Sequence, residues 1–357
     1  RLIMIISYLV FFYCVIFPQH IVKNVIKNKL ATKDVILQRE LTIGERMGIS
    51  NYLFEEIRTF RVDEKGNIFV IDAGANKLLK FNESGHLIWS KGKRGQGPGE
   101  FQLLLGIELS RNNMVIVYDF GNKRISFFNE NGEFVKDLSV KKYSLLNRVD
   151  DDNDGFFYGV LTEYFEDKSI QSLKKFNKTF GAILKEFFQI ERKRTPNKVQ
   201  FISPQIFFRI RNDGLIIYAN NWEYIFYLAN GNGVVKKIIR NEYKPVKYTE
   251  ADKKREFEER YKGRTLPPEL KFIFPDYYPP IEHLLLDDQN NIFVRTYERT
   301  KDGAHYYDYF DAEGRYIASF PMKETIFCIR GDRFYTLEED EEGYQKIVRY
   351  RYRLKLR

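Results

Sequence analysis

One segment of this chain occurs twice. Asp72–Gly85 (DAGANKLLKFNESG) returns as Asp119–Gly132 (DFGNKRISFFNENG), without a gap and with Asp, Gly, Phe, Asn, Glu and the final Gly at the same offsets. Repetition at a spacing of roughly 40–50 residues is typical of solenoids and propellers. The repeat therefore predicts an array of similar small units instead of a conventional single core.

Six such units can be followed along the chain. In each unit, a turn rich in Asp, Asn and Gly lies beside or just before a strongly apolar strand. These strands are Asn67–Asp72, Met114–Asp119, Gly155–Gly159, Gly214–Ala219, Asn291–Thr296 and Arg333–Leu337. The 31 Phe and 24 Tyr residues suit strands packed face to face. We therefore predict an all-β fold, a six-bladed β-propeller with four-stranded antiparallel blades.

The sixth unit is one strand short. It ends on the segment Tyr344–Leu356, whereas Asp34–Ile43 (DVILQRELTI) is a strand-like segment that precedes the first unit. If this N-terminal strand completes the last blade, the ring closes and no blade edge at the junction stays unpaired. We predict that Asp34–Ile43 closes the propeller.

One segment departs from the all-β pattern. Thr249–Lys262 has a Thr N-cap and acidic residues in its first turn, and it ends before Gly263, so we expect a helix. A loop rich in Pro and aromatic residues follows, so that the insertion covers residues 241–280. Long insertions in compact repeats often form binding loops or lids, and capping one end of the ring is the structural alternative.

The first residues form an apolar run, Leu2–Phe17, that carries no charge and ends at Pro18. No small-residue cleavage site precedes Pro18, and Tyr13 stands before Cys14, unlike a lipoprotein signal. We predict a membrane anchor over 1–18, a basic linker over 19–33, and a propeller over 34–357 outside the cytoplasm, in the cell envelope. A cleaved signal peptide, which would give a secreted protein, and a buried apolar strand are the alternatives. The lysines after the run disagree with a cytoplasmic N-terminus.

Charge and cysteine content exclude several classes of protein. The net charge of +9 is concentrated at the two ends of the chain, which does not favour nucleic-acid binding. The chain has two cysteines, Cys14 in the apolar run and Cys328 in the propeller, so no disulfide framework and no cysteine-based zinc site is expected.

A family resemblance rests on two motifs. Gly92–Phe101 (GKRGQGPGEF) stands between the first two units, and Asp119–Ile125 has the pattern Asp-x-Gly-Asn-x-Arg-Ile. Together they resemble the NHL-repeat type of six-bladed β-propeller, most closely its bacterial exported or envelope-anchored members. The resemblance is close over residues 57–142 and implies the fold. It implies little about activity, because propellers include enzymes, receptors and scaffolds.

Two kinds of candidate site stand out. Asp150, Asp152 and Asp154, followed by Gly155, have the alternating carboxylates of a calcium loop, but we favour a plain solvated turn, because Tyr158 and Leu161 stand where such loops need a further acid. No cofactor is expected, with calcium or zinc as the alternative. Trp222, Tyr277, Tyr278 and His283 are candidate ligand-binding residues, since aromatic surface suits peptides and glycans, and packing between blades is the alternative.

The sequence thus predicts a membrane-tethered module that binds and scaffolds a protein, peptide or glycan partner. The predicted contact surface is the face that carries the 241–280 insertion. Related propellers include metal-dependent lyases and lactonases, so the resemblance also implies an alternative in which an enzyme has its site in the central channel. No catalytic residue is assigned, and the interpretation leans towards a binding module.

Overall fold

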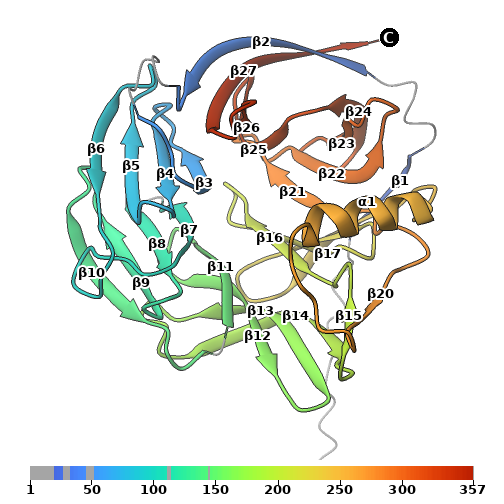
Figure 1. The fold of residues 1–357 in the computed structure, drawn as a ribbon, viewed down its shortest axis with the longest axis horizontal. Helices are drawn as coiled ribbons and strands as arrows, with labels where there is room; N and C mark the ends of the chain where they lie inside the picture. The colour runs from blue at the N-terminus through green and yellow to red at the C-terminus, as the bar shows by residue number, and fades with distance from the viewer. Residues whose placement is uncertain (1–19, 27–32, 46–51, 111–113, 144, 357) are drawn as a thin grey trace, which may run out of the picture.

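Six blades, each with four antiparallel strands, stand around a common axis, and one of them carries a fifth, parallel strand (Figure 1). The structure is a computed structural model, and it describes residues 20–26, 33–45, 52–110, 114–143 and 145–356. The six-bladed propeller predicted from the repeat is confirmed.

Blades 1 to 3 follow one another along the chain. Blade 1 contains β3 (Ile57–Val62), β4 (Ile68–Asp72), β5 (Lys77–Phe81) and β6 (Leu87–Lys91). Blade 2 contains β7 (Leu104–Leu109), β8 (Val115–Asp119), β9 (Arg124–Phe128) and β10 (Phe134–Ser139). Blade 3 contains β11 (Leu145–Asp151), β12 (Phe157–Tyr164), β13 (Lys168–Phe176) and β14 (Ile183–Lys193).

Blades 4 to 6 complete the ring. Blade 4 contains β16 (Ile206–Ile210), β17 (Ile216–Asn220), β18 (Ile225–Ala229) and β19 (Val235–Glu242). Blade 5 contains β21 (His283–Leu286), β22 (Ile292–Arg299), β23 (His305–Phe310) and β24 (Tyr316–Met322). Blade 6 contains β25 (Thr325–Arg330), β26 (Arg333–Glu339), β27 (Gln345–Leu356) and β2 (Lys33–Ile43). The first strand of each blade is the innermost, and these inner strands contact one another around the axis (Figure 1).

The apolar core lies between neighbouring blades. One cluster joins Phe69 and Ile71 of blade 1 to Leu104, Ile107 and Val117 of blade 2. Each blade is covered on both faces, so its second strand is buried along its whole length in blades 1, 2 and 4. This explains why these strands read as continuous apolar runs in the sequence instead of alternating ones.

The N-terminal strand closes the ring as predicted. β2 pairs antiparallel with β27, with Asp34 opposite Lys355 and Ile43 opposite Ile347. Leu41 and Ile43 are buried in the core between blades 6 and 1. The last blade is therefore built from strands near the N-terminus and at the C-terminus of the chain, which protects its edge.

The segment 19–33, predicted to be a basic linker, contains a strand. β1 (His20–Val25) lies parallel to β19 and adds a fifth strand to blade 4. The side chain of Asn24 donates to the Asn241 side chain at 2.9 Å and to the Gly314 carbonyl at 2.8 Å. Val22 packs against the core between blades 4 and 5. Contacts between residues far apart in sequence thus hold a segment whose local charge suggested a linker.

The repeated motif residues build the joints between blades. Asp119 is fully buried, and its carboxylate accepts hydrogen bonds from the backbone of Gln102 and Leu103, where the chain enters blade 2. Arg124 donates to three backbone carbonyls of the Gly92–Phe101 loop, those of Gln96, Gly97 and Glu100. These motif residues are therefore structural.

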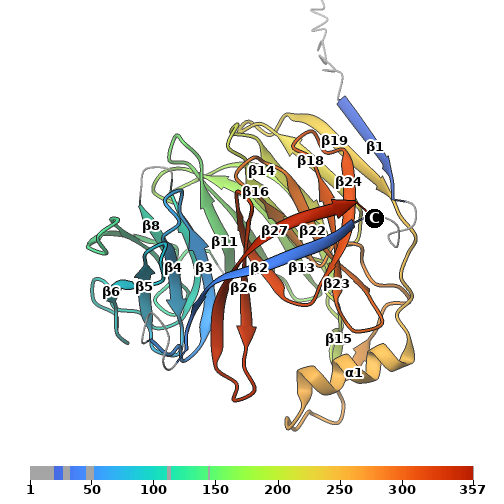
Figure 2. The same cartoon turned by 90° about the horizontal axis from the view of Figure 1, so that it is seen from above.

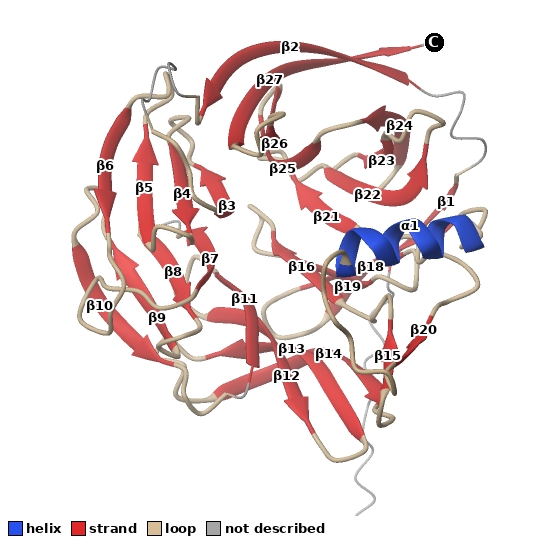
Figure 3. Ribbon diagram, in the orientation of Figure 1, coloured by secondary structure: helices blue, strands red, loops and turns tan. Residues whose placement is uncertain are grey.

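The insertion lies on one face of the ring. α1 (Glu250–Tyr261) begins at Thr249 with a capping box to Asp252, so the predicted helix is confirmed. β15 (Lys198–Gln200) pairs in parallel with β20 (Lys271–Ile273), and Phe272 of β20 contacts Phe257 of the helix (Figure 3). Phe201, Tyr248 and Tyr278 form a small core that joins these pieces. We call this side the insertion face.

The opposite side of the ring carries the turns between the first and second strands of the blades, including 63–66, 152–155 and 287–290. We call it the mouth face. β1 begins on this side, whereas α1 stands out from the other (Figure 2).

The predicted anchor over residues 1–18 lies outside the described residues. Among those that the structure describes, no helix is both long enough and apolar enough to cross a bilayer.

Candidate functional site

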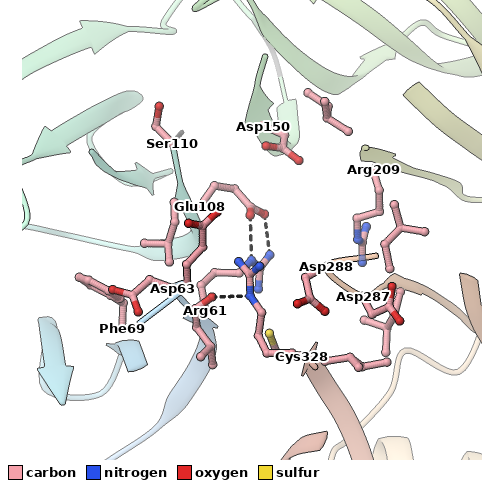
Figure 4. Close-up of a pocket in the computed structure, with 18 of the residues that line it drawn as sticks. Arg61, Asp63, Phe69, Glu108, Ser110, Asp150, Arg209, Asp287, Asp288 and Cys328 are labelled. Carbon is pink, nitrogen blue, oxygen red and sulfur yellow. Dashed lines mark hydrogen bonds and ion pairs between the residues drawn. The ribbon is translucent and has the colours of Figure 1, made fainter. Parts of the chain in front are cut away.

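The inner strands enclose a cavity of about 740 Å³ on the propeller axis. It reaches from the middle of these strands to the turns of the mouth face, because Asp63, Asp287 and Asp288 are among its lining residues. Polar and charged side chains of the inner strands point into it (Figure 4). A cavity of this size suits a small ligand or the end of a longer one.

Four blades place a charged residue at the same position in the cavity wall. Arg61, Glu108, Asp150 and Arg209 each stand two residues before the turn that leaves the inner strand, and all four line the cavity. Because side chains alternate along a strand, this shared position points to the axis in each blade. Four separate inner strands therefore bring charge to one level of the channel.

Glu108 is held by two arginines. Arg61 donates to both of its carboxylate oxygens, at 2.8 Å from Nε and 2.5 Å from an Nη, and an Nη of Arg148 lies 3.2 Å from one of them. Burial favours the neutral acid, but the charges of Arg61 and Arg148 outweigh it, so the pKa of Glu108 is lowered. Glu108 is therefore ionised at neutral pH.

Arg148 stands on an irregular piece of β11. The pairing of β11 with β12 shifts between Asn147 and Val149, and Arg148 has a φ of 39°. A β-bulge adds a residue to one strand and turns its side chain to a new direction, and such bulges are frequent near binding sites. This one lets Arg148 reach the cavity from the same strand as Asp150.

Two further groups of the cavity are shifted towards their neutral forms. Burial, together with the Glu108 charge, raises the pKa of Asp150 to about 7. Burial and the positive charges of Arg209 and Arg148 lower the pKa of His283 well below its usual value. His283 is thus uncharged at neutral pH, and Asp150 is only partly ionised.

Arg209 has a different environment from Arg61. One Nη donates to the Phe208 carbonyl at 2.7 Å. Burial and the nearby charges of Arg148 and Arg61 lower the pKa of Arg209 well below its usual value. The inner part of the cavity therefore carries three guanidinium groups against one fully ionised carboxylate.

The acidic residues at the mouth serve the turns. One carboxylate oxygen of Asp63 accepts from the backbone of Lys65 and Asn67, and the other accepts from the Asn67 side chain. Asp287 makes the same set of bonds in blade 5. Both carboxylates already accept hydrogen bonds from their own turns, as expected for Asp at the start of a tight turn.

The three aspartates predicted as a cation site have different surroundings. Asp150 lines the cavity, whereas the Asp152 carboxylate accepts from the backbone of Asp154 and Phe156 and from the hydroxyl of Tyr158. Asp154 is exposed on the turn. Across the described part of the chain, no group of three or more His, Cys, Asp or Glu side chains is arranged to hold a metal ion.

The four predicted ligand-binding residues are also separated. His283 lines the cavity, while Trp222 (36% exposed) and Tyr277 (51% exposed) lie in segments on the insertion face. Tyr278 is buried: its ring stacks on Tyr297 with centroids 5.0 Å apart, and its hydroxyl donates to Glu256 at 2.5 Å. Tyr278 therefore belongs to the core of the insertion.

Sequence reasoning missed the arginines and the glutamate of the cavity. The sequence does contain a pattern that indicates the cavity wall, because a charged residue stands two positions before the first turn in each of blades 1 to 4. Each unit had to be aligned on its turn before this position could be seen. Arg148 gave no such signal, since the bulge that turns it inward depends on pairing with β12.

The profile of a family described as a 6-bladed beta-propeller, DUF5128, matches residues 50–263. The chain belongs to this family. NHL repeat-containing protein 3 is 30% identical over 86 residues in Homo sapiens and 28% identical over 92 residues in Mus musculus. These alignments cover 23% and 25% of this chain, and the chain spans about a quarter of the length of each relative. The NHL-type resemblance is confirmed.

Solved structures show the same fold at low identity. A Bacteroides fragilis protein whose name describes it as exported superposes with a TM-score of 0.61 at 14% identity, over 93% of this chain and 99% of that one. A DUF4221 family member from Bacteroides vulgatus superposes with a TM-score of 0.52 at 10% identity, over 91% and 99%. At these identities the likeness establishes the propeller fold alone.

Proposed function

We propose that this protein is an extracytoplasmic binding module that holds the end of a peptide or a short glycan in its central cavity. The observation that carries the proposal is the convergence of Arg61, Glu108, Asp150 and Arg209 from four inner strands on a cavity of about 740 Å³. Polar side chains that converge in one concave site are typical of ligand recognition.

The surrounding structure supports a binding role. The rigid ring fixes the inner strands, so the polar groups are positioned before a ligand arrives, which lowers the entropic cost of binding. The joints between blades are built by motif residues that do not reach the cavity. The cavity side chains are therefore free to differ without loss of the fold.

An extracytoplasmic location is supported by the apolar run Leu2–Phe17 and by the likeness to an exported protein. Because β1 begins on the mouth face, a tether that precedes His20 would turn the cavity towards the membrane and leave the insertion face free for a protein partner (Figure 2). Fractionation of cells that express the full chain, or the chain without residues 1–18, tests the tether. We expect the full chain with membranes and the shortened chain in the soluble fraction.

A ligand screen by thermal shift tests the cavity. The probes are acetylated dipeptides, oligosaccharides and small organic acids, each added to the wild type and to Thr59→Trp, which places a large side chain in the cavity wall. Ligands that bind in the cavity should raise the melting temperature of the wild type and lose that effect in the variant. Ligands that shift both proteins equally, or no shift for any probe, would contradict a cavity-binding function.

A further inference from the structure

The cavity holds an arginine that the protein does not neutralise. Arg209 lies on β16 and donates to the carbonyl of Phe208, its own neighbour. Among the residues that the structure describes, no carboxylate oxygen is paired with its guanidinium, whereas Arg61 forms a two-bond pair with Glu108. Arg209 is half-buried in the cavity wall, and a partly desolvated guanidinium without a carboxylate is costly unless an anion approaches it.

Glu108 cannot serve as that anion. Both of its oxygens accept from Arg61, and one of them also lies 3.2 Å from Arg148. The carboxylate next in line, Asp150, stands in the cavity wall two residues after Arg148, and its charge is disfavoured by burial. On the side of the cavity formed by blades 3 and 4, the lining residues Arg148 and Arg209 lie with Asp150 and Asp151. Burial raises the pKa of both carboxyl groups, so their negative charge offsets the two guanidinium groups only in part.

Arg148 adds an unused donor to the same side. Its Nε is buried and has no hydrogen-bond partner. Its backbone has a φ of 39° at the bulge of β11, a conformation that non-glycine residues adopt rarely and at a cost. The guanidinium is also 5.8 Å from the ring of Phe208, the residue before Arg209. This contact places the two arginines on adjacent walls.

We propose that Arg209 and Arg148 form an anion subsite that binds the carboxylate of a ligand held in the central cavity. The inference rests on the proposed function and adds the ligand's chemistry to it. A guanidinium fork matches a carboxylate with two parallel hydrogen bonds. The excess charge is modest, because Glu108 offsets part of it, and this favours a singly charged group over a phosphate dianion.

Matched pairs of probes test the subsite. Binding of acetyl-alanyl-alanine and of its C-terminal amide is measured by calorimetry, together with succinate, its neutral diamide and inorganic phosphate. We expect the acids to bind at least tenfold more tightly than their amides, as a charge-assisted pair implies. Phosphate bound more tightly than either acid would overturn the carboxylate assignment.

Arg209→Gln removes the charge and keeps most of the side chain, so it should weaken binding of the acids at least tenfold and leave the amides unchanged. Arg209→Lys should restore part of the loss. Arg315→Gln is the control, because Arg315 is 68% exposed on the mouth face and paired with Asp311. Near-UV circular dichroism confirms that each variant is folded.

The outcomes separate this inference from the proposed function. If acids and amides bind alike in the wild type, and Thr59→Trp weakens both, the cavity binds ligands but the anion subsite is wrong. If Arg315→Gln weakens acid binding as much as Arg209→Gln, the effect is general surface charge and the subsite is again wrong. If no probe binds, both proposals fall together.

Discussion

Two regions of this propeller use arginine in opposite ways. In the joint between blades 1 and 2, Arg124 donates to three backbone carbonyls and pairs with Asp137 at 2.8 Å. In the central cavity, Arg209 bonds to one carbonyl and faces other arginines. At the joint, the charge of Arg124 holds two blades together. In the cavity, no carboxylate of the described residues pairs with Arg209. Hydrogen-bond partners, and not residue type, distinguish the structural Arg124 from Arg209, which we propose as a binding residue.

The same contrast divides neighbouring aspartates. The Asp152 carboxylate accepts hydrogen bonds from its own turn and from Tyr158. Asp150, two residues earlier, faces the cavity and is shifted towards its neutral form. A candidate cation loop in the sequence is thus divided between a turn and a channel wall.

The largest expected loss of stability follows a substitution at the joint between blades 1 and 2. Arg124→Gln removes hydrogen bonds to three carbonyls and leaves acceptors of the Gly92–Phe101 loop unpaired, so the free energy of unfolding should fall by about 3 kcal/mol. Urea denaturation measures it, with Arg315→Gln as the exposed control. A loss below about 1 kcal/mol would show that the loop holds without this arginine.

The next largest effect is a pH-dependent change in stability caused by Asp150. Its folded pKa of about 7 is raised above the usual 3.8 by burial and Glu108, against the opposing charges of Arg148 and Arg61. The folded state therefore binds a proton that the unfolded state has lost, so stability falls as the pH rises from about 4 to about 7 and stays low above pH 7. Asp150→Asn should be more stable than the wild type by about 2 kcal/mol at pH 8, and the difference should shrink as the pH falls to 4.

The matched control for that prediction is Asp152→Asn. Asp152 serves the turn, so its replacement should lower stability at every pH between 5 and 8. A pH-independent effect of Asp150→Asn would contradict a neutral Asp150 in the cavity.

Two adjacent tyrosines of the insertion should differ in how much they contribute to stability. Tyr278→Phe removes the hydroxyl that donates to Glu256, and stability should fall by about 1 kcal/mol. Tyr277→Ala changes a side chain that is 51% exposed, and stability should change by less than about 0.5 kcal/mol. Equal losses in thermal denaturation would mean that both tyrosines support the insertion.

The smallest expected effect on stability is at Arg209. Burial and neighbouring charges disfavour its ionised form, so Arg209→Gln should leave the free energy of unfolding within about 0.5 kcal/mol of the wild type or raise it. Chemical denaturation without added ligand measures it. A loss comparable to that of Arg124→Gln would show that Arg209 is structural and remove the basis of the anion subsite.

The repeat in the sequence was enough to predict six blades and the strand Asp34–Ile43 that closes the last one, and an N-cap signal predicted the helix after Thr249. These features depend on short-range patterns: buried second strands, turn residues and an N-cap. The strand β1 was not predictable in this way, because Asn24 finds its partners at Asn241 and Gly314, far along the chain.

For the candidate site, too, the sequence decided some features and the tertiary structure decided others. The sequence alone determined the propeller and its repeating turns. Only the tertiary structure decided that His283 and Asp150 share a cavity with Arg209, and that Tyr278 is buried. A propeller places one inner strand from every blade around a single axis, so a site on that axis is assembled from residues that no local sequence pattern brings together.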